Sequence, residues 1–249
     1  MRMYIPLYLT PGCTGIYLRA LRGVEEISIE RTDTATALEL LDSMFDLRNS
    51  TTIKAASIVT ADRDRILATV YRDLFGSKIE STVSCHYCRE RFDVDFSLTT
   101  LLEKLHPGVR QVPENGVYVT ANGISYRLPT GEDEMAAMVP GETDPVQALL
   151  NQCLVAGAEG TDSATVEEQM AATAPVMNLE MQAACPECAR EQKVRFDMQS
   201  FLLLRLKKER PRLLYEVDRI ASSYHWSQHE ILHLPRSLRK QYVDLIEAR

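Results

Sequence analysis

The spacing of apolar residues along the chain predicts several amphipathic helices. Between residues 60 and 75, apolar side chains recur at the three- and four-residue spacing of one helix face. Gly76 follows this stretch, at the position where helices commonly end. A similar stripe predicts a helix over about 34–46 that begins after Asp33, a good N-terminal capping residue. Both apolar faces are expected to pack in the protein core.

Alternation of apolar and polar residues predicts strands elsewhere. Residues 16–21 and 24–29 alternate loosely, which predicts an N-terminal hairpin. Residues 117–120 and 124–128 flank the pair Asn122-Gly123, which a tight hairpin turn favours because both residues tolerate positive φ angles. These segments therefore predict two antiparallel pairs of strands.

The C-terminal part of the chain is predicted to be helical throughout. Pro211 is expected to kink or split the long helical stretch, because proline cannot donate a backbone hydrogen bond. Ser227 and Glu230 have the spacing of a capping box and predict a short helix. Pro235 closes that helix, and a last helix is expected over about 236–247.

Two Cys-x-x-Cys motifs lie one hundred positions apart in segments that resemble each other. We call residues 79–102 the first repeat and residues 179–202 the second repeat. Outside the cysteines, their alignment superposes identical residues at four pairs of positions: Glu80 and Glu180, Val94 and Val194, Phe96 and Phe196, Leu102 and Leu202. Each repeat reads as a strand, a tight turn that carries two thiols, a second strand and a helix start. The sequence thus predicts a duplicated β-hairpin.

Zinc is the expected occupant of a site built from both repeats. Zinc prefers four ligands in a tetrahedron, and a C-x2-C turn brings two sulfurs to one ion. Four sulfurs fill the coordination shell, so we predict a single structural zinc held by Cys85, Cys88, Cys185 and Cys188. In the chain-entropy model, a tie of this span is worth about 4–5 kcal/mol. A disulfide, a redox-active motif and ordinary buried thiols are alternatives.

Composition narrows the class of protein. At 249 residues the chain can form one large or two small domains. A net charge of −7 disfavours a general phosphate-binding surface and therefore nucleic acid. The sequence shows neither a membrane-length apolar run nor a signal peptide at its start, so we expect a cytoplasmic protein with reduced thiols. Cys13 and Cys153 have no partner at this spacing and are expected to be plain apolar residues.

A second metal motif competes with the cysteines. His229, Glu230 and His233 have the H-E-x-x-H spacing of zinc peptidases, in which two histidines hold zinc and the glutamate activates water. Pro235 ends the helix too early for this role, and Glu230 already serves the Ser227 cap. Motifs for phosphate binding or for nucleophilic catalysis are missing, so we predict neither an enzyme nor a small-molecule substrate.

A further pattern consists of the two cysteine motifs together with these segments: 61–68, 75–76, 127–130, 149–153, 196–197, 214–221, 224–227 and 230–235. On these residues, the chain resembles the baseplate hub assembly proteins of contractile-tailed phages. The same family occurs in phage-tail-like contractile injection systems. The resemblance covers roughly residues 55–249, and its closing stretch is the most specific part.

This resemblance implies a non-enzymatic baseplate component or assembly chaperone. Its partners would be hub, spike or tape-measure proteins, and it would act in the cytoplasm during assembly, with or without a place in the finished particle. His229 and His233 fall where the family pattern is loose, whereas Trp226 and Glu230 fall where it is firm. The resemblance therefore implies that the H-E-x-x-H match is accidental. Some members lack one or both cysteine motifs, so zinc would serve stability.

The expected fold is α+β, with duplicated β-hairpin units that form one four-cysteine zinc site, helices around them and a helical C-terminal segment. We expect an N-terminal hairpin and helix in residues 1–55 and a core that contains both repeats in residues 56–202. A helical segment would occupy residues 203–249. A zinc peptidase that uses residues 229–233 and a zinc ribbon that binds nucleic acid are the alternative functions.

Overall fold

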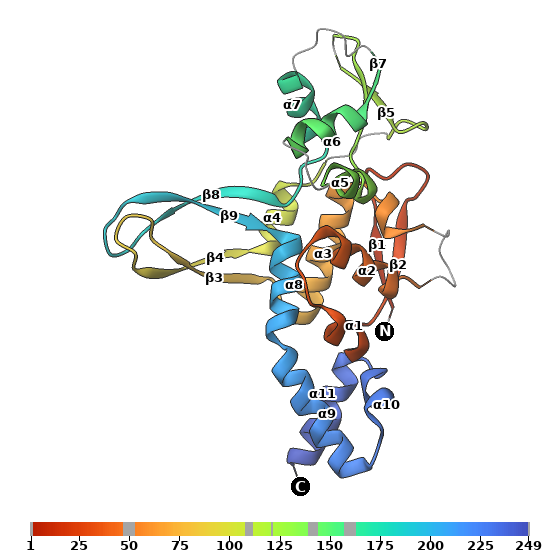
Figure 1. Ribbon diagram of the computed structural model, residues 1–249, viewed down its shortest axis with the longest axis vertical. Helices are drawn as coiled ribbons and strands as arrows, with labels where there is room; N and C mark the ends of the chain where they lie inside the picture. Colours follow the sequence, from red (N-terminus) through yellow and green to blue (C-terminus); the bar gives the residue numbers. More distant parts are fainter. Residues whose placement is uncertain are drawn as a thin grey trace. The chain divides into compact units, whose positions relative to one another are not determined.

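The structure is a computed structural model that describes residues 2–46, 53–107, 112–120, 122–138, 144–156 and 163–248 (Figure 1). The chain divides into two compact units. The first unit comprises Met1–Pro6, Gly15–Ala56 and Gln199–Arg249, and the second comprises Leu7–Thr14 and Ser57–Met198. Each unit therefore combines segments that are distant in sequence.

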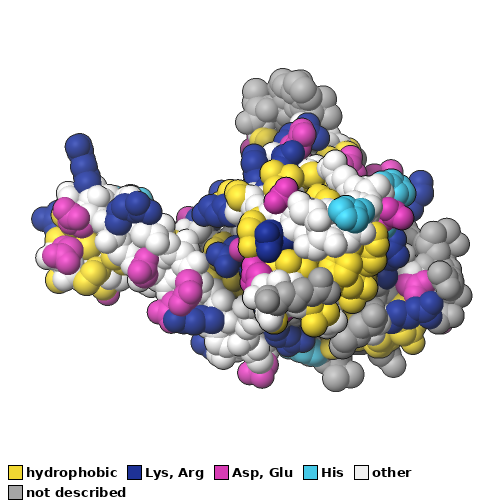
Figure 2. Space-filling view, turned by 90° about the horizontal axis from the view of Figure 1, so that it is seen from below, with side chains coloured by type: hydrophobic (Ala, Val, Ile, Leu, Met, Phe, Trp, Pro, Cys, Tyr) yellow, Lys and Arg dark blue, Asp and Glu magenta, His cyan; other side chains and the backbone are white. Residues whose placement is uncertain are grey.

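The two units differ in charge. The second unit contains 12 Lys and Arg residues against 22 Asp and Glu residues, a net charge of −10, so the first unit carries the remaining +3 of the total of −7. Acidic and basic side chains are interspersed on the face that Figure 2 shows. Both cysteine motifs belong to the acidic unit, and a negative charge there opposes the binding of nucleic-acid phosphates.

In the first unit, strand β1 (Arg2–Pro6) pairs antiparallel with β2 (Gly15–Arg19). Helix α1 (Gly23–Ser28) follows, so the hairpin predicted from residues 16–21 and 24–29 is wrong. The Glu25 carboxylate accepts a hydrogen bond from the backbone N–H of Arg22 at 2.8 Å and pairs with Arg19. These contacts start a helix where the apolar pattern alone resembled a strand.

Apart from α1, the α-helices of the first unit begin and end close to the predicted positions. Asp33 caps α2 (Thr34–Met44) by accepting the Thr36 N–H at 3.0 Å. Pro211 lies in the first turn of α9 (Arg210–Tyr224) and separates it from α8 (Met198–Lys208), which confirms the predicted split. The remaining elements are η1 (Ala55–Ser57), α10 (Gln228–Leu232) and α11 (Arg236–Glu247).

A buried network of ion pairs joins α1 to the C-terminal helices. Arg239 on α11 is fully buried and binds Glu26 on α1 and Glu216 on α9, the latter at 3.0 Å. Arg236 reaches Glu26 at 2.6 Å and Glu209 at 2.7 Å. A buried guanidinium is tolerated only when carboxylates compensate its charge. The network therefore specifies how α1, α9 and α11 pack.

In the second unit, helix α3 (Thr60–Phe75) organises the loops around it. The buried Asp62 carboxylate accepts hydrogen bonds from the backbone N–H groups of Tyr8, Leu9 and Thr10 at 2.8–3.0 Å. Asp64 accepts the N–H of Met177 at 2.9 Å. Gly76 ends the helix with a φ of 85°, as predicted.

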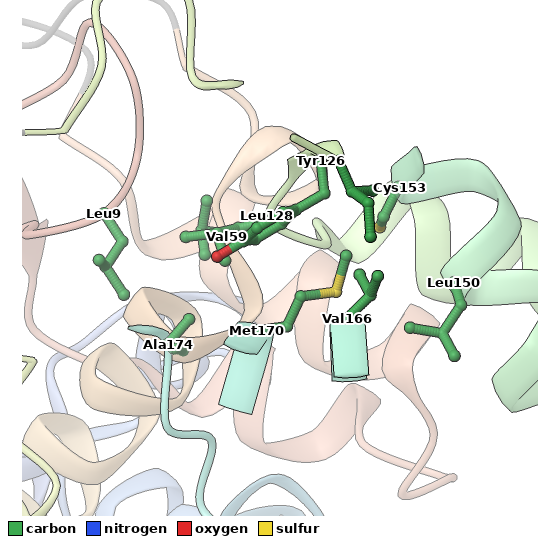
Figure 3. Packing of buried hydrophobic residues seen from close by; sticks show 11 residues of the cluster. Leu9, Val59, Tyr126, Leu128, Leu150, Cys153, Val166, Met170 and Ala174 are labelled. Carbon is green, nitrogen blue, oxygen red and sulfur yellow. The ribbon is translucent and has the colours of Figure 1, made fainter. Parts of the chain in front are cut away.

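One core of the second unit lies between a small sheet and three helices, α3, α6 (Pro145–Cys153) and α7 (Ser163–Thr173) (Figure 3). The sheet has the order β5 (Val117–Val119), β6 (Ser125–Arg127), β7 (Leu154–Ala156), and the hairpin β5-β6 confirms the prediction from Asn122-Gly123. Cys153 is fully buried in this core, as expected for an apolar residue. Helix α5 (Gly131–Ala137) is a further element of this unit.

The two repeats fold as matching hairpins, which confirms the α+β class and the duplicated unit. Hairpin β3-β4 comprises Lys78–Ser84 and Arg91–Ser97, and hairpin β8-β9 comprises Asn178–Ala184 and Glu191–Asp197. Their registers are the same at an offset of one hundred residues. A helix follows each hairpin directly: α4 (Leu98–Lys104) after the first and α8 after the second. Among the described helices, none is long and apolar enough to cross a bilayer.

Candidate metal centre

The two cysteine turns adopt one conformation. In the first, the N–H of Cys85 donates to the carbonyl of Glu90 at 2.8 Å, and the N–H of Arg89 donates to the carbonyl of Cys85 at 3.0 Å. The second turn repeats both bonds, from Cys185 and Ala189, at 3.0 and 2.9 Å. Arg89 and Ala189 both have the left-handed backbone conformation, with φ angles of 67° and 56°. The two turns, which are repeated in the sequence, therefore also share one backbone geometry.

The hairpins lie side by side and bring the four sulfurs together (Figure 1). Phe96 and Phe196 meet edge to face between them, with 4.9 Å between ring centroids. The sulfur of Cys85 lies 3.6 Å from that of Cys188, and the sulfurs of Cys88 and Cys185 are 3.7 Å apart. All four sulfurs lie within 4.8 Å of one another.

These distances fit a metal ion. A tetrahedron of sulfurs about 2.3 Å from a central zinc has edges of about 3.8 Å, close to the two cross-repeat distances. A disulfide would need sulfurs only about 2.05 Å apart. The four cysteines that the sequence singled out are therefore one cluster with the donor set and spacing of a metal site.

The cluster has an apolar base and an open side. Cys85 and Cys185 are buried, Cys188 is half-buried and Cys88 is exposed. Phe92 packs with the two buried cysteines, and the side chains of Val83, Val94 and Ala183 surround them. This packing shields one side of the cluster from water.

The surroundings of Cys85 and Cys88 shift the pKa values of their thiols in opposite directions. Hydrogen bonds from the backbone N–H groups of Cys88 and Tyr87 lower the pKa of the Cys85 thiol to about 6. The N–H of Glu90 favours the Cys88 thiolate, yet desolvation and the neighbouring thiols raise the pKa of Cys88 to about 12. A bound cation favours the thiolate form of its cysteine ligands, because it compensates their negative charge.

The H-E-x-x-H residues have another arrangement. The Glu230 carboxylate accepts hydrogen bonds from the N–H and hydroxyl of Ser227 at 2.8 and 2.7 Å, which confirms the predicted capping box. His233 lies just beyond α10, and its Nδ1 is 2.8 Å from the carbonyl of His229. In the part of the chain that the structure describes, the four cysteines are the one group of three or more potential ligands gathered for a metal.

Sequence reasoning missed one polar residue beside the cluster. Gln192 on β9 is only 6% exposed, and its side chain contacts the first cysteine turn. The position equivalent to Gln192 in the first repeat is Phe92. This difference between equivalent positions, an apolar side chain in one repeat and an amide in the other, was the sequence signal that could have identified Gln192.

The paired hairpins define a protein whose two small β units meet at a cluster of cysteines. Residues 20–203 match the family described as T4 bacteriophage base plate protein. The match spans more than half of the chain and both cysteine motifs, so the chain belongs to this family of baseplate structural proteins, whose partners are other baseplate proteins. The family match begins before residue 55, where the resemblance noted from the sequence began, and it ends at residue 203. The closing stretch at 214–235 lies outside this match, so its resemblance stays a prediction. No curated protein and no solved structure matches the chain.

Proposed function

We propose that this chain is a non-enzymatic structural or chaperone-like assembly subunit of the hub at the tip of a contractile-tail baseplate. The tail would be that of a phage or of an injection system. The match of residues 20–203 to a base plate family carries this proposal. Hub, spike or tape-measure proteins are the partners we expect, and the cytoplasm is where the complex would form.

We further propose that Cys85, Cys88, Cys185 and Cys188 hold one structural zinc. The sulfur distances and the shielded base of the cluster support this ion. Four sulfur ligands complete the shell and leave no position for a reactive water, so the zinc would stabilise the fold and not catalyse a reaction. The chemistry that zinc supplies here is a cross-link between the repeats.

A cross-link matters because each hairpin is a poor structure alone. An isolated two-stranded hairpin is marginally stable in water. Here the ring contact of Phe96 with Phe196 joins the strands that lead away from the turns, and the cysteines join the turns themselves. A metal at the turns would hold the two hairpins as one rigid body, which suits a subunit that presents a fixed surface to assembly partners.

Copurification tests the assembly role. The chain is co-expressed with the hub, spike and tape-measure proteins of its own tail and purified through an affinity tag on one partner at a time. We expect a stable complex with at least one of them. A chain that stays monomeric with every partner would contradict the proposal.

Metal content separates the structural role from a peptidase. We expect one zinc per chain by elemental analysis, lost on Cys185→Ser and retained on His229→Ala. A second zinc that disappears with His229→Ala would instead revive the H-E-x-x-H site. A chain with no zinc, purified under reducing conditions without chelators, would refute the structural metal.

A further inference from the structure

Gln192 joins the second repeat to the cysteine turn of the first. Its side-chain oxygen accepts a hydrogen bond from the backbone N–H of His86 at 2.8 Å, and its side-chain nitrogen donates to the carbonyl of Ser84 at 3.2 Å. His86 lies between Cys85 and Cys88 in the sequence, and Ser84 directly precedes Cys85. The amide of Gln192 therefore holds the backbone on both sides of one ligand.

The duplication explains why this contact occurs in one direction. The residue equivalent to His86 in the second turn is Pro186, which has no N–H to satisfy. The residue equivalent to Gln192 in the first repeat is Phe92, which can neither accept nor donate. The two differences are complementary. The first turn has an N–H at its second residue and contacts a glutamine of the second repeat. The second turn has a proline at that position, and the first repeat has a phenylalanine where the second repeat has the glutamine.

The burial of Gln192 makes the contact costly to lose. Its side chain is 6% exposed, and buried polar groups without partners carry a desolvation penalty. Removing the amide would also leave the His86 N–H without its acceptor. Proline restricts the backbone of the second turn through its ring, whereas a histidine does not. The first turn thus needs an external contact to obtain the rigidity that Pro186 provides in the second turn.

We propose that Gln192 is a positioning residue for the metal centre, which pre-organises the Cys85–Cys88 turn for the ion from across the repeat interface. This inference rests on the proposed zinc. It predicts that the centre opens unevenly, because the first turn depends on the second repeat for its shape. Residues that orient metal ligands from outside the coordination shell typically change metal affinity about 10- to 100-fold when mutated.

The test is zinc transfer to a chromogenic chelator from the full-length protein. Gln192→Leu keeps the size of the side chain and removes the amide, and we expect release to become about 10- to 100-fold faster. Gln182→Leu is the matched control, because Gln182 is an exposed glutamine on the neighbouring strand β8. Equal release rates from the Gln192→Leu and Gln182→Leu proteins would overturn the proposal.

A double-mutant cycle distinguishes positioning from packing. His86→Pro gives the first turn the residue of the second and removes the N–H that Gln192 accepts. In this background Gln192→Leu should have a much smaller effect on zinc release than in the native sequence. An effect of the same size in both backgrounds would show that Gln192 acts through packing alone. If Gln192→Leu does not fold, Gln192→Met, which is of similar length and also lacks the amide, replaces it in the cycle.

Two readouts locate the effect. Alkylation followed by mass spectrometry should modify Cys85 and Cys88 before Cys185 and Cys188 in the Gln192→Leu protein. If the native protein binds no zinc, the proposed metal fails by itself. The contact is then tested by hydrogen exchange at the His86 amide of the metal-free protein, which should accelerate with Gln192→Leu, and an unchanged rate would refute the contact.

Discussion

The sulfur of Cys85 lies 3.6 Å from the sulfur of Cys188, although 103 residues separate the two in sequence. These two cysteines belong to different repeats, so their proximity depends on how the hairpins pair. The site therefore exists only when both repeats are folded and paired. Loss of any one ligand should loosen the contact between the repeats as well as the metal.

We predict that Cys185→Ser removes the zinc and lowers the free energy of unfolding by about 4–5 kcal/mol, the value of a tie across this span. Denaturant unfolding of the zinc-loaded protein measures the change. Cys13→Ala serves as the control, since Cys13 lies outside the cluster. Equal losses for both variants would mean that the cluster holds no stabilising ion.

A glycine should improve the second turn. Ala189 has a φ of 56°, a conformation that disfavours residues with a Cβ and suits glycine. We expect Ala189→Gly to raise the free energy of unfolding by about 0.5–1 kcal/mol after the greater unfolded-state entropy of glycine is counted. Ala184→Gly, in strand β8, should lower it by about the same amount. Urea unfolding of the two variants measures these changes in the free energy of unfolding, which should have opposite signs.

The Asp133 carboxyl should make the stability of the fold depend on pH. Burial alone would raise the pKa of its carboxyl, but hydrogen bonds from Arg127 and Thr130 outweigh burial and lower the pKa below 3.8. A carboxyl whose pKa is lower in the folded state stabilises the fold above pH 3.8 and loses this effect as the pH falls through the folded value.

Asp133→Asn should therefore cost about 1–2 kcal/mol at pH 7, because a capping-box acceptor and an ion pair are lost. The cost should be smaller at pH 3 than at pH 7, because the stability that a carboxyl with a lowered pKa contributes is lost as the pH falls below its unfolded-state value. Urea unfolding at the two pH values measures both, and Glu132→Gln on the exposed side of α5 is the control. A cost independent of pH would contradict the assigned charge.

Arg239 should be among the least replaceable residues of the first unit. Arg239→Met leaves the buried carboxylate of Glu216 without its closest partner and removes one of two arginines on Glu26. Breaking a buried ion pair typically costs about 3–5 kcal/mol. Lys240→Met, at the exposed neighbouring position, should cost much less. Thermal unfolding compares the two variants.

The features that sequence alone determined are local or repeated. The cap at Asp33 and the capping box of Ser227 with Glu230 link residues three apart, so their hydrogen bonds follow from the order of residues. The four cysteines were found because two copies of one pattern share the same spacing. Neither inference required knowledge of which distant segments meet.

Tertiary structure decided the contacts that join distant segments. Strand β2 pairs with β1 and not with residues 24–29, because Glu25 and Glu26 bind arginines and start a helix. The acceptor role of Gln192 also depends on a partner more than one hundred residues away. A one-dimensional pattern records the polarity of a side chain, but the partner that satisfies a buried polar group is chosen when the chain folds.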